Sequence, residues 1–227
     1  MLCETWQLET VPGKLDPLSA AFNSFSWAED VSVKLLCKPR STGERGGGLA
    51  FVFKSSLNFS FFNLNINPES FEFLCVKFKG CPPCLFVCFY RRSSVSFVTF
   101  RLEFAEFLDA LNLVPMPCFI LGDFNVKIND LLLSETRSFC SICDDYNFTC
   151  CFPSQSTHTG GNTLDFLVVN SASAYLCSDL FVHDDIVLSD HFPVSVQLQL
   201  EPLSRTVAPR CFRSFASIID DDFSSSL

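Results

Sequence analysis

The sequence predicts one domain of the α/β class, and two observations indicate this class. Short extended apolar runs alternate with one or two helical patterns along the 227 residues, and no internal repeat is present. Hydrophobic residues make up 48% of the chain and charged residues 18%, a balance typical of chains that bury a core. A chain of this length can bury that core within a single domain. We therefore expect a domain over residues 1–200 and a linker or tail over 201–227, where Pro, Ser, Arg and an acidic run replace the pattern.

The first half of the predicted domain contains three strands and a helix. Apolar runs rich in aromatic and β-branched side chains predict strands at 49–53, 71–78 and 84–90. Between 97 and 112 the apolar side chains change to the spacing of one helix face, from Phe100 to Leu111. Prolines follow this segment, so the helix ends before them.

The second half contains three further strands. The run 118–121 predicts a compact buried strand that leads directly into a Gly-Asp-Phe-Asn turn. Residues 164–169 and 192–200 also read as strands, and the second alternates apolar with polar side chains, as a strand with one face in water does.

Cysteine count, apolar run length and net charge indicate which cellular compartment and which binding partners to expect. The 13 cysteines are an odd number, and acidic Glu4 stands where a signal peptide carries basic and then apolar residues, so we expect reduced thiols in an intracellular protein, nuclear or cytoplasmic, that is not secreted. No apolar stretch is long enough for a membrane span, so we expect no membrane partner. The net charge of −9 divides into +3 over residues 1–101 and −12 over 102–227. Nucleic acid could then be held only by local basic side chains and a metal beside the acidic part; the candidate side chains are Lys34, Lys38, Arg40, Arg45, Lys54, Arg91 and Arg92.

Three groups of residues could carry chemistry, and each also has a structural interpretation. Asp123 and Asn125 follow a buried strand, where α/β sites collect, although Gly-Asp-x-Asn is also common in turns. Asp190 and His191 are adjacent on a short segment and could bind a metal and move a proton, or simply form a solvated loop. Asp165 lies among strand apolars and needs a partner, which is either backbone amides or a histidine. Among His158, His183 and His191, we expect His191 to be that partner, because a carboxylate can orient an imidazole.

Six segments, taken in order, resemble the endonuclease/exonuclease/phosphatase superfamily, and most closely the endonuclease domain of LINE-type (non-LTR) retrotransposons. The resemblance spans nearly the whole chain, and the tail resembles the segment that joins this domain to a reverse transcriptase, which is itself absent here. The segments are Cys3-Glu4-Thr5-Trp6, Gly46-Gly47-Gly48-Leu49-Ala50-Phe51, Phe89-Tyr90-Arg91, Leu121-Gly122-Asp123-Phe124-Asn125, residues 157–165 (Thr-His-Thr-Gly-Gly-Asn-Thr-Leu-Asp) and Ser189-Asp190-His191-Phe192-Pro193-Val194.

The resemblance implies a DNase I-like sandwich of two sheets with outer helices, and hydrolysis of DNA phosphodiester bonds that leaves a nick. Glu4 and Asp190 would hold a divalent metal, Mg²⁺ or Mn²⁺. His191, oriented by Asp165, would act as base toward water or as a partner of the scissile phosphate, while Asp123 and Asn125 position nucleophile and phosphate oxygens. Whether Asp123 or His191 is the base stays open at this point. The residues implied to contact substrate are Tyr90, Asn125, Thr157 and, beside Tyr90, Arg91.

The sequence also departs from the family pattern at its beginning. Family domains begin with a strand that bears an active-site Asn and a helix, and only three residues precede Glu4 here. We therefore expect a domain without its first strand and helix, from a truncated gene model or a decaying retroelement copy, in which catalysis is impaired.

Three alternatives accompany the nuclease interpretation. The same fold could be a catalytically silent scaffold, or a phosphatase of the same superfamily, because fold alone does not name a substrate. The third alternative is a structural zinc module, built on Cys81, Cys84, Cys140 and Cys143, which form two C-x-x-C pairs.

Overall fold

The computed structural model describes residues 2–3, 33–38, 48–186 and 189–202, and all structural statements below refer to these. Its centre is a six-stranded sheet with the order β4-β5-β7-β8-β10-β9. β7 and β8 are parallel, and the other neighbours in this sheet are antiparallel. The strands are β4 (Phe59–Phe61), β5 (Phe71–Phe78), β7 (Cys84–Arg91), β8 (Cys118–Asp123), β9 (Phe148–Cys151) and β10 (Asp165–Asn170).

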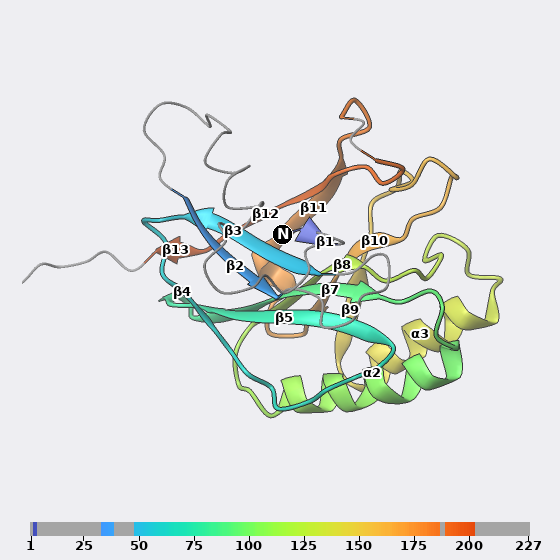
Figure 1. Ribbon diagram of the computed structural model, residues 1–227, viewed down its shortest axis with the longest axis horizontal. Coiled ribbons are helices and arrows are strands. Elements are labelled where there is room, and N and C mark those ends of the chain that lie inside the picture. The colour runs from blue at the N-terminus through green and yellow to red at the C-terminus, as the bar shows by residue number, and fades with distance from the viewer. Residues whose placement is uncertain (1, 4–32, 39–47, 187–188, 203–227) are drawn as a thin grey trace, which may run out of the picture.

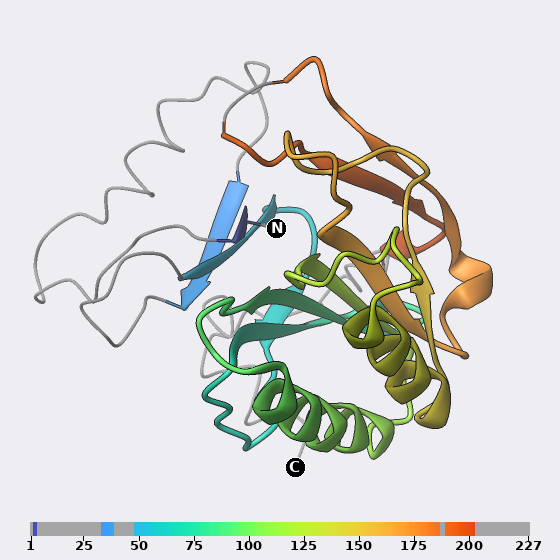
Figure 2. The same cartoon turned by 90° about the vertical axis from the view of Figure 1, so that its right-hand side faces the viewer.

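Helices cover one face of this sheet and shorter strands cover the other (Figure 1). The helices α2 (Phe97–Asn112) and α3 (Ser134–Asp145) pack side by side, as the turned view in Figure 2 shows. The opposite layer contains a three-stranded sheet, β1-β3-β2, and the pair β11-β12. Its strands are β1 (Leu2–Cys3), β2 (Val33–Lys38), β3 (Leu49–Lys54), β11 (Cys177–Val182), which follows the short 3₁₀ helix Ala174–Leu176, and β12 (Val194–Leu198). This arrangement confirms the predicted two-sheet α/β sandwich with outer helices.

The coverage of both faces explains why the central strands are apolar without alternation. In β5, Phe71 and Phe73 belong to the core beneath the helices, whereas Leu74 and Val76 belong to the core between the sheets. Seven of the eight residues of β5 are therefore buried, whichever face they point to. Aromatic rings fill much of the helix-side core, where Phe124 stacks on neighbouring rings.

The helix α2 has the bounds that its periodicity predicted. Ser96 caps its first turn, since the Ser96 hydroxyl accepts a hydrogen bond from the N–H of Thr99 at 3.2 Å. The buried face consists of the five side chains that the spacing selected: Phe100, Phe104, Phe107, Leu108 and Leu111. No helix in the described part of the chain is both long and apolar enough to cross a membrane.

The zinc alternative is wrong, because the main sheet separates its cysteines. Cys84 is buried in the core between the sheets, and Cys143 is buried on α3 in the core beneath the helices. Thiolates on opposite faces of one sheet cannot share a tetrahedral ion.

The predicted tail begins with a short strand. Glu201 and Pro202 form β13, which pairs with β6 (Gly80–Cys81). Residues 203–227 lie outside the described residues, as does Glu4.

Candidate active site

A row of polar side chains crosses four adjacent strands at one end of the central sheet. Glu72 on β5 pairs in register with Tyr90 on β7, Tyr90 with Asp123 on β8, and Asp123 with Asp165 on β10. Register partners share a face of a sheet, and Tyr90 contributes to the core between the two sheets. The row is thus the point at which that apolar core gives way to polar groups.

The Gly-Asp-Phe-Asn turn places Asp123 and Asn125 together. A Cβ on Gly122 would lie 1.8 Å from the backbone oxygen of Phe89 on the adjacent strand, so only glycine fits there. Phe124 points to the other face, where its ring stacks on Phe166 at a centroid distance of 4.3 Å and anchors the turn. Both carboxylate oxygens of Asp123 accept hydrogen bonds from Asn125, one from the backbone N–H and one from Nδ2, each at 2.9 Å.

Arg91 fixes the conformation of Asn125. The Arg91 guanidinium donates to the Asn125 carbonyl at 2.7 Å, and Asn125 Nδ2 donates to the Arg91 carbonyl at 2.8 Å. Asn125 has a φ of 50°, a left-handed conformation that Asn tolerates better than most residues. The Arg91 side chain is only 5% exposed and lies over the Phe100 ring. In this structure, Arg91 therefore stabilises the turn that carries Asn125 through these two hydrogen bonds. Substrate contact by Arg91 stays a prediction.

Asp165 and His191 form the expected pair. The Nδ1–H of His191 donates to Asp165 Oδ2 at 2.7 Å, which directs His191 Nε2 away from Asp165. The hydroxyl of Thr157 accepts the backbone N–H groups of Leu164 and Asp165 at 2.9 and 3.0 Å. Thr157 has no exposed surface, so in this structure it positions the start of β10. Substrate contact by Thr157 stays a prediction.

The segment that carries Asp190 and His191 is held against the loop after β9. The N–H of Thr159 donates to the Asp190 carbonyl, and the N–H of Phe192 donates to the Thr157 carbonyl, at 2.9 and 2.8 Å. These bonds flank an antiparallel bridge between His158 and His191. Two loops that are distant in the sequence thus form one edge of the site.

The environment of His191 favours its protonated form. The hydrogen bond that His191 donates to Asp165 is the largest cause and outweighs desolvation, and the charges of Asp165, Asp123 and Asp190 add to it. Together they raise the pKa of His191 from 6.5 to about 9. The imidazole is therefore a cation near neutral pH in the metal-free chain.

Carboxylate oxygens are available here for a divalent cation. One oxygen each of Asp123 and Asp165 and a ring nitrogen of His191 lie within 4.8 Å of one another, and Asp190 presents a carboxylate that is 69% exposed. Because His191 Nδ1 already donates to Asp165, the carboxylate oxygens of these residues are the candidate ligands. Oxygen donors suit Mg²⁺ or Mn²⁺. The described residues at this end of the sheet, Asp190 included, therefore offer oxygen donors of the kind that the predicted metal prefers.

Sequence reasoning missed two residues of this site, Glu72 and His158. Glu72 accepts the N–H of Gly48 at 2.8 Å and pairs with Arg92 at 3.0 Å, which ties the segment before β3 to the row. A carboxylate inside an apolar strand was the signal that identified Asp165, and it applies equally to Glu72. His158 was compared only as a partner for Asp165, whereas the structure places its Nε2 3.4 Å from Asp190.

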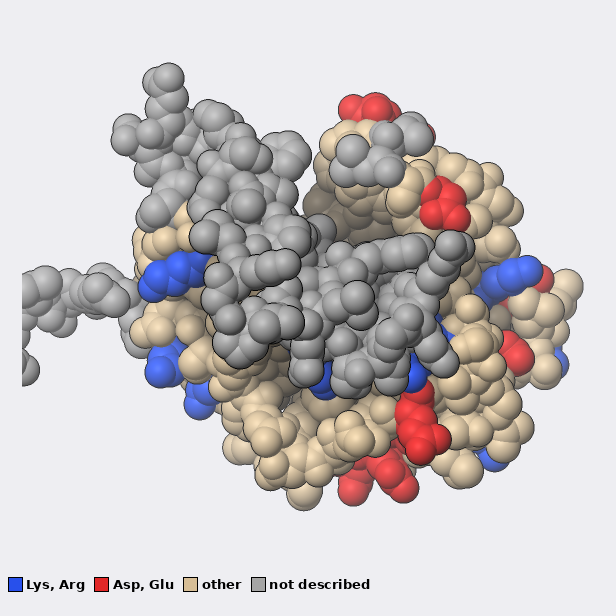
Figure 3. Space-filling view, in the orientation of Figure 1, with Lys and Arg blue, Asp and Glu red and all other residues tan. Residues whose placement is uncertain are grey.

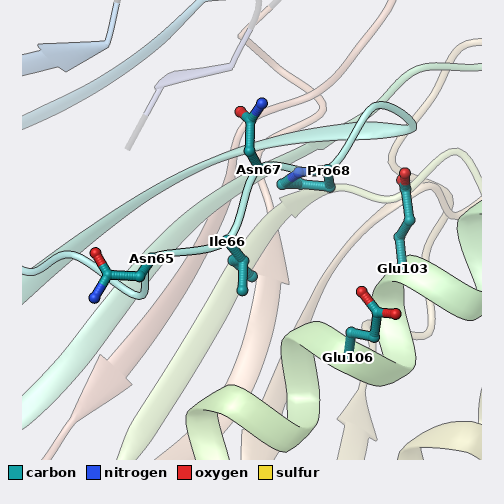
Figure 4. Close-up of a pocket in the computed structure, with 6 residues that line it drawn as sticks. All are labelled: Asn65, Ile66, Asn67, Pro68, Glu103 and Glu106. Carbon is teal, nitrogen blue, oxygen red and sulfur yellow. The ribbon is translucent and has the colours of Figure 1, made fainter.

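Away from the row, a hollow of about 290 Å³ lies between residues 65–68 and α2 (Figure 4). Figure 3 shows acidic side chains gathered over this helix. The carboxylate of Glu103, which lines the hollow, already accepts the backbone N–H groups of Glu69 and Ser70. Although burial alone would raise the pKa of Glu103, these hydrogen bonds and that of the Ser70 hydroxyl lower it. Glu103 thus holds the loop before β5 against α2 through these hydrogen bonds. None of the residues in the polar row lines this hollow.

The chain matches one family model, described as the endonuclease/exonuclease/phosphatase family, over residues 1–191. No curated protein matches it.

Solved structures give the same fold at low identity. The endonuclease domain of TRAS1, a telomere-specific non-LTR retrotransposon, superposes with a TM-score of 0.61 at 13% identity, over 74% of this chain and 78% of that one. A protein of the same family from Leptotrichia buccalis gives 0.60 at 12% identity, over 87% and 85% of the two chains. The 3'-5' exonuclease NExo from Neisseria meningitidis gives 0.57 at 16% identity, over 86% of each chain. At these identities the likeness shows the fold, and the substrate has to be argued from the site.

Proposed function

Because the chain belongs to the endonuclease/exonuclease/phosphatase family, we propose that it is a divalent-metal-dependent endonuclease of retrotransposon origin that nicks DNA. The observation that carries this proposal is the row Tyr90, Asp123 and Asp165 across three strands, with His191 hydrogen-bonded to Asp165 at its end. The likeness to the TRAS1 endonuclease domain supports DNA as the substrate. The retrotransposon-like segment 157–165 supports it further, because this segment supplies Asp165 and contacts the loop of Asp190.

The geometry suggests separate roles for Asp123 and His191. With Nδ1 bound to Asp165, His191 has Nε2 available to a ligand, and its raised pKa makes Nε2–H a donor to a phosphate oxygen. Asp123 is held by both of its oxygens through Asn125, which gives it a fixed orientation toward an attacking water. We therefore assign the phosphate contact to His191 and the role of base to Asp123. In the reaction, the water oxygen bonds to phosphorus as a deoxyribose oxygen leaves.

A metal would be held by Asp190, together with Glu4 from outside the described residues. When bound, it would supply positive charge to the phosphate oxygens. Tyr90 lies beside Asp123 in the row, and we assign its hydroxyl a contact with the same phosphate. Asn125 shares that edge and completes the contacts that orient the substrate.

The test is nicking of supercoiled plasmid by the purified full chain with Mg²⁺, with and without EDTA. Asp190→Ala and His191→Ala each remove a group needed for attack and are expected to abolish nicking, and Asp123→Asn to lower it strongly. His183→Gln is the matched control, because His183 bonds Ser195 away from the row and should leave nicking unchanged. Unchanged nicking in the Asp190 and His191 variants would refute the site. A folded chain that cleaves only small phosphomonoesters would favour the phosphatase alternative.

A further inference from the structure

The His158 side chain makes three contacts, and none of them has a part in the roles proposed above for the nuclease reaction. Its Nδ1 accepts the backbone N–H of Gly160 at 2.8 Å, and its Nε2 lies 3.4 Å from Asp190 Oδ2. Its ring meets that of His191 edge to face, with centroids 4.9 Å apart and an interplanar angle of 83°. His158 thus contacts both chemically important residues of the opposite loop.

The contact with Gly160 determines which nitrogen of His158 carries the proton. A backbone N–H can only donate, so Nδ1 must present its lone pair. The proton of the neutral imidazole then lies on Nε2, which is 3.4 Å from Asp190 Oδ2. A neutral histidine that ligates a metal through Nε2 needs its proton on Nδ1. His158, Asp190 and His191 lie close enough to share an ion, but in this tautomer His158 has no lone pair on Nε2 to offer a metal, and Nε2–H can only donate.

Asp190 requires such a partner because of its exposure. Its backbone is fixed through its carbonyl, but its side chain is 69% exposed and can rotate in water. An exposed pair of this kind contributes little to folding stability. Its effect is instead on orientation, since a partner that holds a metal-binding carboxylate in one rotamer raises the affinity for the metal.

Gly160 is the residue that allows this contact. A Cβ at position 160 would lie 2.9 Å from His158 Nδ1 and 3.2 Å from Cε1, closer than such atoms approach without displacement. The glycine therefore lets the backbone N–H reach the ring. It also provides a way to displace the ring without altering any residue that faces the substrate.

We propose that His158 is a positioning residue, whose Nε2–H orients the carboxylate of Asp190 for the divalent metal while its ring supports His191. This inference rests on the proposed function, because it assigns Asp190 to the metal. It adds a residue to the site that acts only through its neighbours.

Two amide substitutions separate the two nitrogens of His158. The side chain of Gln places an N–H donor near the position of Nε2, so His158→Gln retains the contact with Asp190. The side chain of Asn places an acceptor near the position of Nδ1, so His158→Asn retains the contact with Gly160 and loses the one with Asp190. The two variants are thus matched controls for each other.

The primary measurement is Mn²⁺ binding to the full chain without DNA, followed by electron paramagnetic resonance. His158→Asn is expected to weaken Mn²⁺ binding about tenfold, Gly160→Ala to weaken it in the same direction, and His158→Gln to remain within about threefold of wild type. The Mg²⁺ concentration for half-maximal nicking should follow the same order. Imidazole ¹⁵N NMR of the wild type should show the Nε2–H tautomer for His158.

The outcomes distinguish the inference from the function on which it rests. Wild-type affinity in His158→Asn, equal loss in the Asn and Gln variants, or an Nδ1–H tautomer would each overturn the positioning role alone. A folded wild-type chain that binds no Mn²⁺ would overturn the metal site and, with it, both proposals.

Discussion

The hydrogen bond between Asp165 and His191 leads to a prediction about folding stability that does not depend on any catalytic activity. The pKa of His191 is about 9 in the folded chain, against an ordinary value of 6.5. The folded state therefore holds the proton more tightly than the unfolded state does. The resulting stabilisation is complete below pH 6.5 and is lost as the pH rises through about 9.

The size of the effect follows from the same two values. At about 1.4 kcal/mol per pH unit, the raised pKa contributes up to about 3 kcal/mol to the free energy of unfolding. This is an upper value, because the His191 side chain is 27% exposed and water screens part of the interaction. Removing the Asp165 carboxylate removes the largest cause of the shift.

The perturbation is Asp165→Asn, which keeps the shape and an oxygen that can accept from Nδ1–H but removes the charge. Urea unfolding of wild type and variant, at a series of pH values from about 6 to about 9, gives the free energy of unfolding for each. The wild type is expected to lose stability over this range by up to about 3 kcal/mol more than the variant does. A reductant is needed throughout, because the structure contains free thiols such as Cys75, Cys81 and Cys84.

The comparison between the two chains removes the contribution of those thiols. Burial raises the pKa of several cysteines, among them Cys75, so both chains lose some stability at high pH for the same reason. His191→Gln is the second control, because it deletes the titrating group and should also flatten the curve. Parallel curves for wild type and Asp165→Asn across the whole range would refute the reasoning.

Three further predictions concern the turn that carries the site. Gly122→Ala should destabilise the chain by about 3 kcal/mol or prevent folding, because its Cβ would meet the backbone of Phe89, and circular dichroism melts would measure this; a wild-type melting temperature would contradict it. Phe124→Ala should cost about 3–5 kcal/mol in urea unfolding, since a fully buried stacked ring is lost, and a cost below about 1 kcal/mol would show that the turn is not anchored there. Arg91→Met should retain much of the packing but lose the bond to the Asn125 carbonyl, so the nicking rate should fall while the Mg²⁺ dependence is unchanged; a shifted Mg²⁺ dependence would show that the turn and the metal site are coupled.

Elements with dense local patterns were predictable from the sequence. α2 was predicted with its correct bounds because five large apolar side chains mark one face. β5 and β7 were recognised as continuous apolar runs, and the structure shows that layers on both faces make them so.

Elements with small or half-buried side chains were missed. α3 buries Thr136, Phe139 and Cys143, and a face made mainly of a threonine and a cysteine carries little hydrophobic signal. Its cysteines were interpreted instead as half of a possible zinc site. The strands of the outer layer, such as β2 and β11, bury one face only in part, which leaves a weak pattern.

The sequence by itself determined the fold class, the family resemblance and most of the polar residues of the site, because these depend on local periodicity and on short motifs at strand ends. It also identified His191 as the partner of Asp165, since an embedded carboxylate requires one. Only the tertiary structure decided that Glu72 joins the row and that His158 faces Asp190. Register across strands and the pairing of two distant loops bring these groups together. Both are long-range relations, so no short stretch of sequence contains the information that would predict them.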